Sequence, residues 1–236
     1  NTMDAAKKIK GDNNAMQKAL EKITSLIGNY KEPQKQATSF ADLDKIITDY
    51  VDAEIKSAYE LQTNQDYDKA IKVYDETRQI IAFMHDIATK KTKLSDIGQK
   101  VEAAKNAKQA DIQAFSSAIL KVRNGMDSTT FDRKYGTKFQ PTSSINTIKT
   151  LLASDPLKKK STNTEVVSLT ARFNKLISYF EDNKNSLVIL SDKDSSKALK
   201  AATDLMAKAK AAEVGKLEIS FLQLKIDSLE TIIKSS

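Results

Sequence analysis

The sequence contains no cysteine and no tryptophan, and its only histidine is His85. Without cysteine the chain can form no disulfide and has no thiol chemistry, and one histidine cannot complete a His–Cys ligand set for zinc. Histidine-centred catalysis is not expected either, because no motif supplies a nucleophile or carboxylate partner for His85. The sequence also lacks a P-loop, a dinucleotide-binding motif and a nucleophile elbow. We therefore expect no metal, no cofactor and no enzymatic activity.

Glycine and proline are scarce, with 6 and 3 residues respectively in a chain of 236. β-Sandwiches, barrels and Rossmann folds need many tight turns, so this scarcity argues against all three classes. The chain has no apolar run of about 18 residues, which predicts that no helix crosses a membrane. No signal peptide is visible, but the chain begins with Asn1 rather than methionine, so we expect it to be processed or trimmed.

Apolar residues recur at steps of three and four along most of the chain, which is the spacing of a buried helix face. Breaks and capping residues predict helices at about residues 12–30, 39–61, 66–90, 95–125, 144–152, 164–180 and 195–233. We therefore predict an all-α fold, a bundle of long antiparallel helices. We expect one helical domain over residues 1–236, with a basic, loop-containing insert at about 125–163 between two helical halves.

Three features lead to predictions for the core. The helix that begins at Thr164 has a predicted buried face of Val167, Leu169, Phe173, Leu176, Ile177 and Phe180. A heptad seam near the C-terminus, suited to packing along a neighbouring helix, comprises Ile219, Leu222, Ile226, Leu229 and Ile233. His85 lies among apolar residues of the predicted helix 66–90, and we interpret it as a core or boundary histidine.

A metal site is one hypothesis for the group of acidic residues Asp42, Asp44, Asp49, Asp52 and Glu54. Carboxylate metal sites in helical bundles normally use a Glu-x-x-His pattern from facing helices, which this sequence lacks. We therefore interpret the group as a solvated helix face. Asp192 and Asp194 begin like a calcium-binding loop but lack its central glycine and distant glutamate, so we interpret them as a helix cap.

The net charge of +7 is concentrated in the middle of the chain. Residues 91–160 contain 14 Lys and Arg against 6 Asp and Glu, a net charge of +8. The longest non-periodic stretch, residues 125–142, lies in this region and combines cations with aromatic rings, which together can clamp anionic ligands. The candidate site for an anionic partner comprises Arg123, Arg133, Lys134, Tyr135 and Lys138. The alternative is a lysine-rich solubilising surface whose aromatic residues pin the loop to the bundle.

A short motif is similar to the second helix of a tetratricopeptide repeat, in which a small residue and a tyrosine let two helices pack closely. It consists of Ala58-Tyr59 followed by residues 66–74. No second copy follows at the period of about 34 residues, and a lone repeat cannot bury its own faces. We therefore favour an ordinary helical hairpin.

Two stretches carry a resemblance to a known family. They are residues 58–83, a tyrosine-rich hairpin with Asp66-Tyr67-Asp68, and residues 170–176 with the long neighbouring helix. They resemble the YiiG-like family of exported bacterial lipoproteins, whose function is unknown. The resemblance implies a lipid-anchored mature domain and supplies no catalytic residues. In composition the chain is also similar to helical surface lipoproteins of host-associated bacteria, which bind host proteins.

These patterns lead to one expected function and one alternative. We expect a non-enzymatic exported protein of the bacterial envelope, the mature part of a lipoprotein, in the periplasm or at the cell surface. Its expected partner is a protein or an anionic surface, without specific recognition of nucleic acid. Its expected link to a membrane is a lipid anchor preceding Asn1. The alternative is a cytosolic helical adaptor that binds an anionic partner or polymer.

Overall fold

The computed structural model confirms the predicted all-α class. It describes residues 13–26, 40–130, 144–184, 186, 190 and 192–235. Within these residues there are nine helices and no β-strand, and none of the helices is long and apolar enough to cross a membrane. The chain divides into two compact units, Asn1–Ala110 and Asp111–Ser236, which we call the N-terminal unit and the C-terminal unit.

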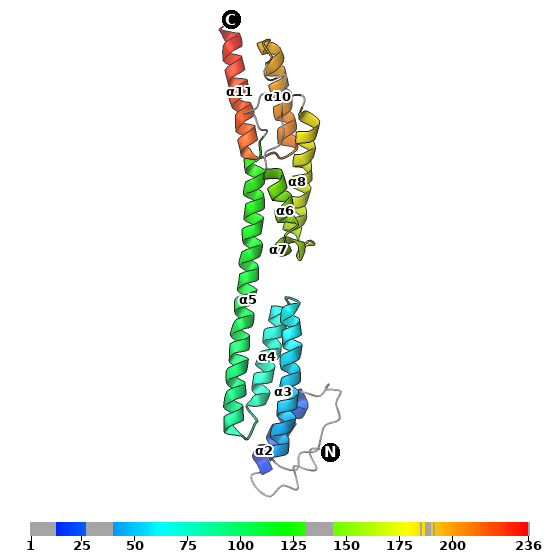
Figure 1. Ribbon diagram of the computed structural model, residues 1–236, viewed down its shortest axis with the longest axis vertical. Helices are drawn as coiled ribbons and strands as arrows, with labels where there is room; N and C mark the ends of the chain where they lie inside the picture. Colours follow the sequence, from blue (N-terminus) through cyan, green and yellow to red (C-terminus); the bar gives the residue numbers. More distant parts are fainter. Residues whose placement is uncertain are drawn as a thin grey trace. The chain divides into compact units, whose positions relative to one another are not determined.

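The N-terminal unit contains α2 (Asn13–Leu26), α3 (Phe40–Thr63), α4 (Tyr67–Ile81) and the first part of α5 (Ile87–Ser128) (Figure 1). Each helix turns an apolar face toward the others, and these faces form one core. Among its completely buried side chains are Leu43, Ile47, Tyr74, Ile81 and Ile97. The core therefore draws on α3, α4 and α5 together.

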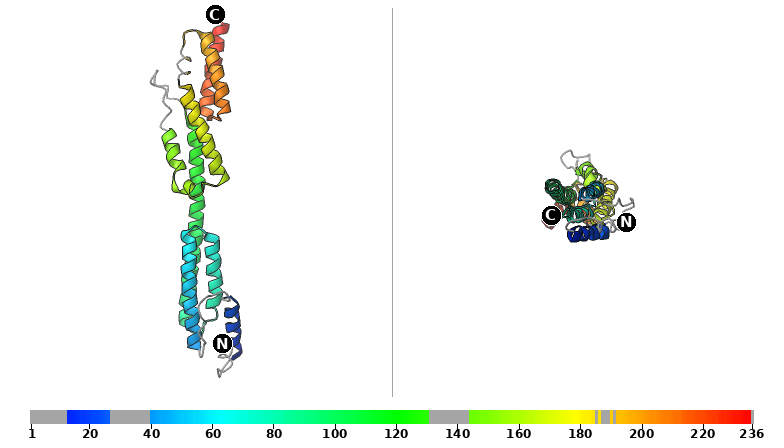
Figure 2. Two further views of the ribbon diagram at one scale, coloured as in Figure 1. Left: turned by 90° about the vertical axis from the view of Figure 1, so that its right-hand side faces the viewer. Right: turned by 90° about the horizontal axis from the view of Figure 1, so that it is seen from below.

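Helices α3 and α4 form an antiparallel hairpin and lie side by side (Figures 1 and 2). Ala58 of α3 and Ala70 of α4 are both completely buried in the unit's core. Small side chains at a helix–helix contact allow a short distance between the axes. Gln65, in the turn, has a φ of 65°, the left-handed conformation that closes the short connection. Ala58 and Ala70, the small residues of the repeat-like motif, thus allow α3 and α4 to pack closely in a helical hairpin.

The turn between α4 and α5 lies at residues 82–86, so the predicted break at 90–95 was wrong. The carboxylate of Asp44, on α3, fixes this turn. It accepts hydrogen bonds from the backbone N–H groups of His85 (2.6 Å) and Asp86 (2.7 Å). Asp44 is 41 residues before His85, so no local pattern could have placed the turn.

Asp86 caps the first turn of α5, because its carboxylate accepts hydrogen bonds from the backbone N–H of Ala88 and the hydroxyl of Thr89. The bond from Thr89 is the main reason that the pKa of Asp86 is lowered. His85 is exposed in the turn rather than buried on a helix face, which corrects the interpretation as a core or boundary residue. Its ring stacks on Phe40 at a centroid distance of 4.3 Å.

Replacing Asp44 by alanine should lower the free energy of unfolding by about 1–2 kcal/mol, the usual effect of losing a cap. The substitution removes the acceptor of two backbone N–H groups. Urea unfolding followed by circular dichroism measures the change. Asp49→Ala is the control, because the ion pair of Asp49 with Lys45 of its own helix, at 3.6 Å, is exposed. Equal effects of the two substitutions would contradict the role of Asp44.

In the C-terminal unit, the described residues form the rest of α5 and five further helices. These are α6 (Ser144–Leu152), α7 (Asp155–Lys158), α8 (Thr164–Asn183), α10 (Ser195–Ala211) and α11 (Lys216–Lys234). A turn separates α10 from α11, so the single helix predicted at 195–233 is two helices that form an antiparallel hairpin (Figures 1 and 2). The side chain of Asp194 accepts hydrogen bonds from the backbone of Ser196 and Lys197, which confirms the predicted cap.

The buried face of α8 follows steps of three and four, as predicted, but begins one residue earlier. It comprises Val166, Leu169, Phe173, Leu176, Tyr179, Phe180 and Asn183. Phe173, Leu176 and Phe180 are confirmed as core residues, and Ile177 is partly buried beside them. Val167 was wrongly predicted to be buried and is 54% exposed, because one residue rotates a side chain by about 100° around a helix. Of the predicted C-terminal seam, Leu222 and Leu229 are buried, Ile219 and Ile226 are partly buried against the same core, and Ile233 is exposed.

The described residues of the predicted insert, 125–163, contribute to the core of the C-terminal unit. Ile148 of α6 and Leu157 of α7 are completely buried in it. Helix α6 ends at Leu152, and Pro156 lies in the first turn of the next helix, α7. The first turn of a helix tolerates proline because its N–H groups have no partner within the helix.

Candidate functional site

Arg123 is the one member of the predicted anionic site that lies within the described residues. The other four, Arg133, Lys134, Tyr135 and Lys138, lie outside the described residues. The guanidinium group of Arg123 forms an ion pair with the carboxylate of Glu165, with 2.5 Å between Nη2 and Oε1. This pair connects α5 to α8, so the charge of Arg123 already has an opposite charge beside it.

Other cations of the basic region, residues 91–160, also connect helices. Lys93 forms an ion pair with Asp52 of α3 at 2.8 Å. Lys108 forms one with Asp68 of α4 at 2.5 Å. Both lysines belong to α5, and both pairs hold this helix against the α3–α4 hairpin. Part of the positive charge in this region therefore supports packing within the N-terminal unit.

The acidic residues between 42 and 54 have different structural roles and do not form one site. Asp44 holds the α4–α5 turn and Asp52 pairs with Lys93, as described above. Burial, and secondarily the negative charge of Glu76, raises the pKa of Glu54. In the part of the chain that the structure describes, no three potential ligands lie close enough together to hold a metal ion.

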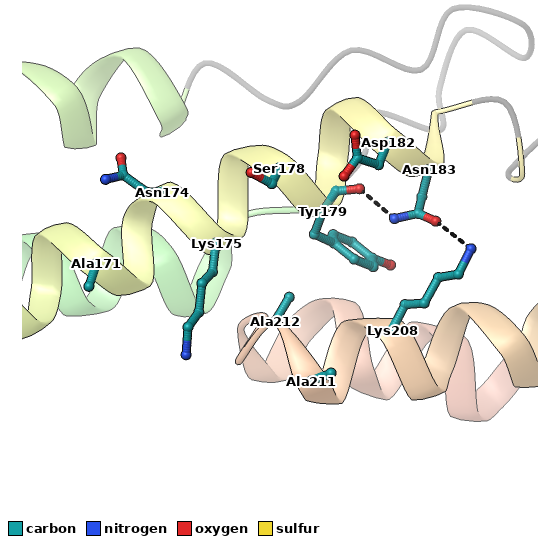
Figure 3. Close-up of a pocket in the computed structure, with 10 residues that line it drawn as sticks. All are labelled: Ala171, Asn174, Lys175, Ser178, Tyr179, Asp182, Asn183, Lys208, Ala211 and Ala212. Atoms are coloured by element: carbon teal, nitrogen blue, oxygen red, sulfur yellow. Dashed lines mark hydrogen bonds between the residues drawn. The ribbon is translucent and has the colours of Figure 1, made fainter.

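A surface pocket of about 710 Å³ lies within the C-terminal unit, between α8 and the C-terminal end of α10 (Figure 3). This volume is typical of sites for small molecules, which span about 300–1,000 Å³. Three alanines line it: Ala171 of α8, Ala211 of α10 and Ala212, which follows α10. Their small side chains leave the space between the two helices open.

Two lysines line the pocket, and each is held by a partner. Lys175 of α8 forms an ion pair with Glu213, with 2.5 Å between Nζ and Oε1. Lys208 of α10 donates a hydrogen bond to Oδ1 of Asn183 at 3.1 Å. The hydrogen bond from Lys175 is the main reason that the pKa of Glu213 is lowered. The charge of Lys175 is thus compensated by a carboxylate, while the partner of Lys208 is a neutral amide.

Asn183 orients Lys208. The side chain of Asn183 is only 4% exposed, and its Nδ2 donates a hydrogen bond of 2.8 Å to the backbone oxygen of Tyr179, one helical turn earlier. This bond directs Oδ1 toward α10, where it accepts from Lys208 (Figure 3). A buried amide needs both partners, because an unsatisfied buried polar group is costly. The two bonds therefore fix the position of the ammonium group at the pocket.

The α10–α11 turn beside the pocket is tied to two other helices. Arg172 of α8 forms an ion pair with Asp127 of α5 at 2.6 Å and donates a hydrogen bond to the backbone oxygen of Glu213 at 3.1 Å. Gly215, the N-cap of α11, lies directly against the backbone of α5 at Met126 and Asp127. These contacts hold the α10–α11 turn, whose first residue, Ala212, lines the pocket.

Replacing Glu213 by glutamine should destabilise the protein slightly at pH 7, and the difference should disappear on acidification. The pKa of Glu213 in the folded protein is below its ordinary value of 4.5, so the carboxylate stabilises the fold above this pH. That stability is lost as the pH falls through the lowered pKa. Urea unfolding at pH 7 and at pH 3 measures the difference. Glu230→Gln, in an exposed pair with Lys234, is the control and should have a smaller effect.

The residues of this pocket were not predicted from the sequence. Asn183 gave the one available signal, because it continues the buried apolar face of α8 with a polar residue. Lys208 gave none, since it lies 25 residues further on, in a helix with several other lysines. Comparisons of the chain with protein-family models, curated proteins and solved structures gave no match.

Proposed function

We propose that the protein is a non-enzymatic binding protein exported to the bacterial envelope, where it is the mature part of a lipoprotein. The observation that carries the binding role is the pocket between α8 and α10, which is open and has an oriented ammonium group at its edge. The location in the envelope is supported by the resemblance of residues 58–83 and 170–176 to exported lipoproteins.

The roles of other polar residues also support a binding protein rather than an enzyme. His85, the single histidine, stacks on Phe40, and its backbone is held by Asp44. Arg123 and Arg172 connect α8 to α5 through ion pairs. These side chains hold helices and turns in place, and the fold presents the pocket as a fixed surface.

Metabolic labelling with an alkyne analogue of palmitate tests the proposed location. Bacteria that express the full-length gene should incorporate the label into this protein, and the protein should be recovered with the envelope fraction. The matched control is residues 1–236 preceded only by methionine, which should remain unlabelled. If the full-length product is unlabelled and stays in the cytosol, the location is wrong, and the alternative of a cytosolic adaptor is supported.

A further inference from the structure

We propose that the pocket between α8 and α10 binds a small monocarboxylic acid with a short apolar body, and that Lys208 holds its carboxylate. This inference rests on the proposed binding role and assigns the ligand class of that site. It follows from three observations: the charge at the pocket, the orientation of that charge, and the lining of the space beside it.

The cation available to a ligand is Lys208. Its described hydrogen bond goes to a neutral amide, and no carboxylate within the described ranges lies within 4.0 Å of its ammonium group. Asp182 also lines the pocket but forms no ion pair with Lys208. Lys175 is different, because Glu213 neutralises it. Within the described part of the chain, Lys208 is thus the lysine of the pocket that has no carboxylate within ion-pair distance, although Asp182 contributes a negative charge to the same lining. One lysine of this kind matches a ligand with a single negative charge.

The orientation is fixed before a ligand arrives. A lysine side chain is long and flexible, and ordering it when a ligand binds costs free energy. Here the buried Asn183 accepts one N–H, so two of the three donors of the ammonium group remain for a ligand. Hydrogen bonds between an ammonium group and a carboxylate are among the stronger ones in proteins.

The remaining lining suits a small apolar body. Ala171, Ala211 and Ala212 present methyl groups, and the methylene chain of Lys175 lies beside them (Figure 3). Ser178, Asn174 and Asp182 supply polar groups at the same pocket. A carboxylate held at Lys208 would therefore place a short aliphatic chain along the alanines. A phosphate dianion fits less well, because it would bring two negative charges to one lysine in a pocket that already contains the carboxylate of Asp182.

Titration with hexanoate, compared with neutral hexanamide of the same shape, tests this inference. Amide NMR signals of Ala211 and Ala212 should shift and saturate with hexanoate, and hexanamide should bind roughly tenfold or more weakly. A tenfold change corresponds to about 1.4 kcal/mol, within the range for one hydrogen bond to a charged group. Constant ionic strength keeps general screening equal in the two titrations.

Three variants identify the group responsible. Lys208→Met keeps the aliphatic chain and should weaken hexanoate binding roughly tenfold or more, to the level of hexanamide. Lys210→Met is the matched control on the same helix, outside the pocket lining, and should leave binding unchanged. Asn183→Asp keeps Lys208 but places a carboxylate beside it, and should also weaken binding; circular dichroism confirms that this variant is folded.

Each result bears on the inference. Equal affinity for hexanoate and hexanamide, or equal loss in Lys208→Met and Lys210→Met, would overturn the carboxylate assignment while leaving the pocket as a binding site. If neither compound shifts the NMR signals of Ala211 and Ala212, the carboxylate assignment is wrong, and so is the proposal that the protein binds its ligand in this pocket. Neither result affects the labelling experiment, so failure of the envelope location is recognised separately.

Discussion

Replacing Gly215 by alanine is expected to destabilise the C-terminal unit by about 3 kcal/mol or more, at the upper end of the effect of overpacking. An added Cβ would lie 2.3 Å from the backbone oxygen of Met126 and 2.4 Å from Cα of Asp127. Both are backbone atoms of α5, so no side-chain rotation can relieve the overlap. The start of α11 would have to move away from α5. This movement would disturb the ion pair of Arg172 with Asp127 and its hydrogen bond to the backbone of Glu213.

Two other glycines provide graded controls for Gly215→Ala in urea unfolding. Gly125→Ala would place Cβ 2.8 Å from Cγ1 of Ile148, a side-chain atom, so we expect a smaller loss of about 1–2 kcal/mol. Gly98→Ala has nothing within 4 Å and lies inside α5, so it should stabilise the protein by about 0.5–1 kcal/mol. If all three substitutions have similar effects, the close approach at Gly215 does not limit stability.

The fold class followed from the sequence because helix periodicity is a local property. Leu43, Ile47 and Val51, for example, follow one another at steps of four, and all three are buried on one face of α3. The α4–α5 turn could not be placed in this way. Lys90-Lys91-Thr92 has the composition of a helix end, but Asp44 draws the turn to residues 82–86 through contacts across 41 and 42 residues of sequence.

The candidate site was less predictable than the fold, because it depends on contacts between residues far apart in the sequence rather than on local sequence patterns. Arg123 belongs to a basic region, yet its function in packing depends on Glu165, 42 residues away. The partner of Lys208 is Asn183, and nothing in the sequence near either residue indicates the other. The net charge of residues 91–160 therefore did not indicate which of its cations form ion pairs between helices, as Lys93, Lys108 and Arg123 do.

Replacing Phe173 by alanine is expected to lower the free energy of unfolding by about 3–5 kcal/mol, the usual range for a large aromatic residue in a core. Phe173 is 5% exposed and lies in the centre of the buried face of α8, between Leu169 and Leu176. Truncation would leave a cavity lined by side chains of several helices, which cannot all move inward. Thermal and urea unfolding of the variant measure the loss.

Two adjacent valines test the register of this helix independently of Phe173. Val166 is buried and Val167 is 54% exposed, although the sequence pattern placed Val167 in the core. Val166→Ala should therefore lower the free energy of unfolding by more than about 1 kcal/mol. Val167→Ala, which removes the same atoms, should stay within about 0.5 kcal/mol of the parent protein. The opposite order would mean that α8 is rotated by one residue, and Asn183 would then no longer face Lys208.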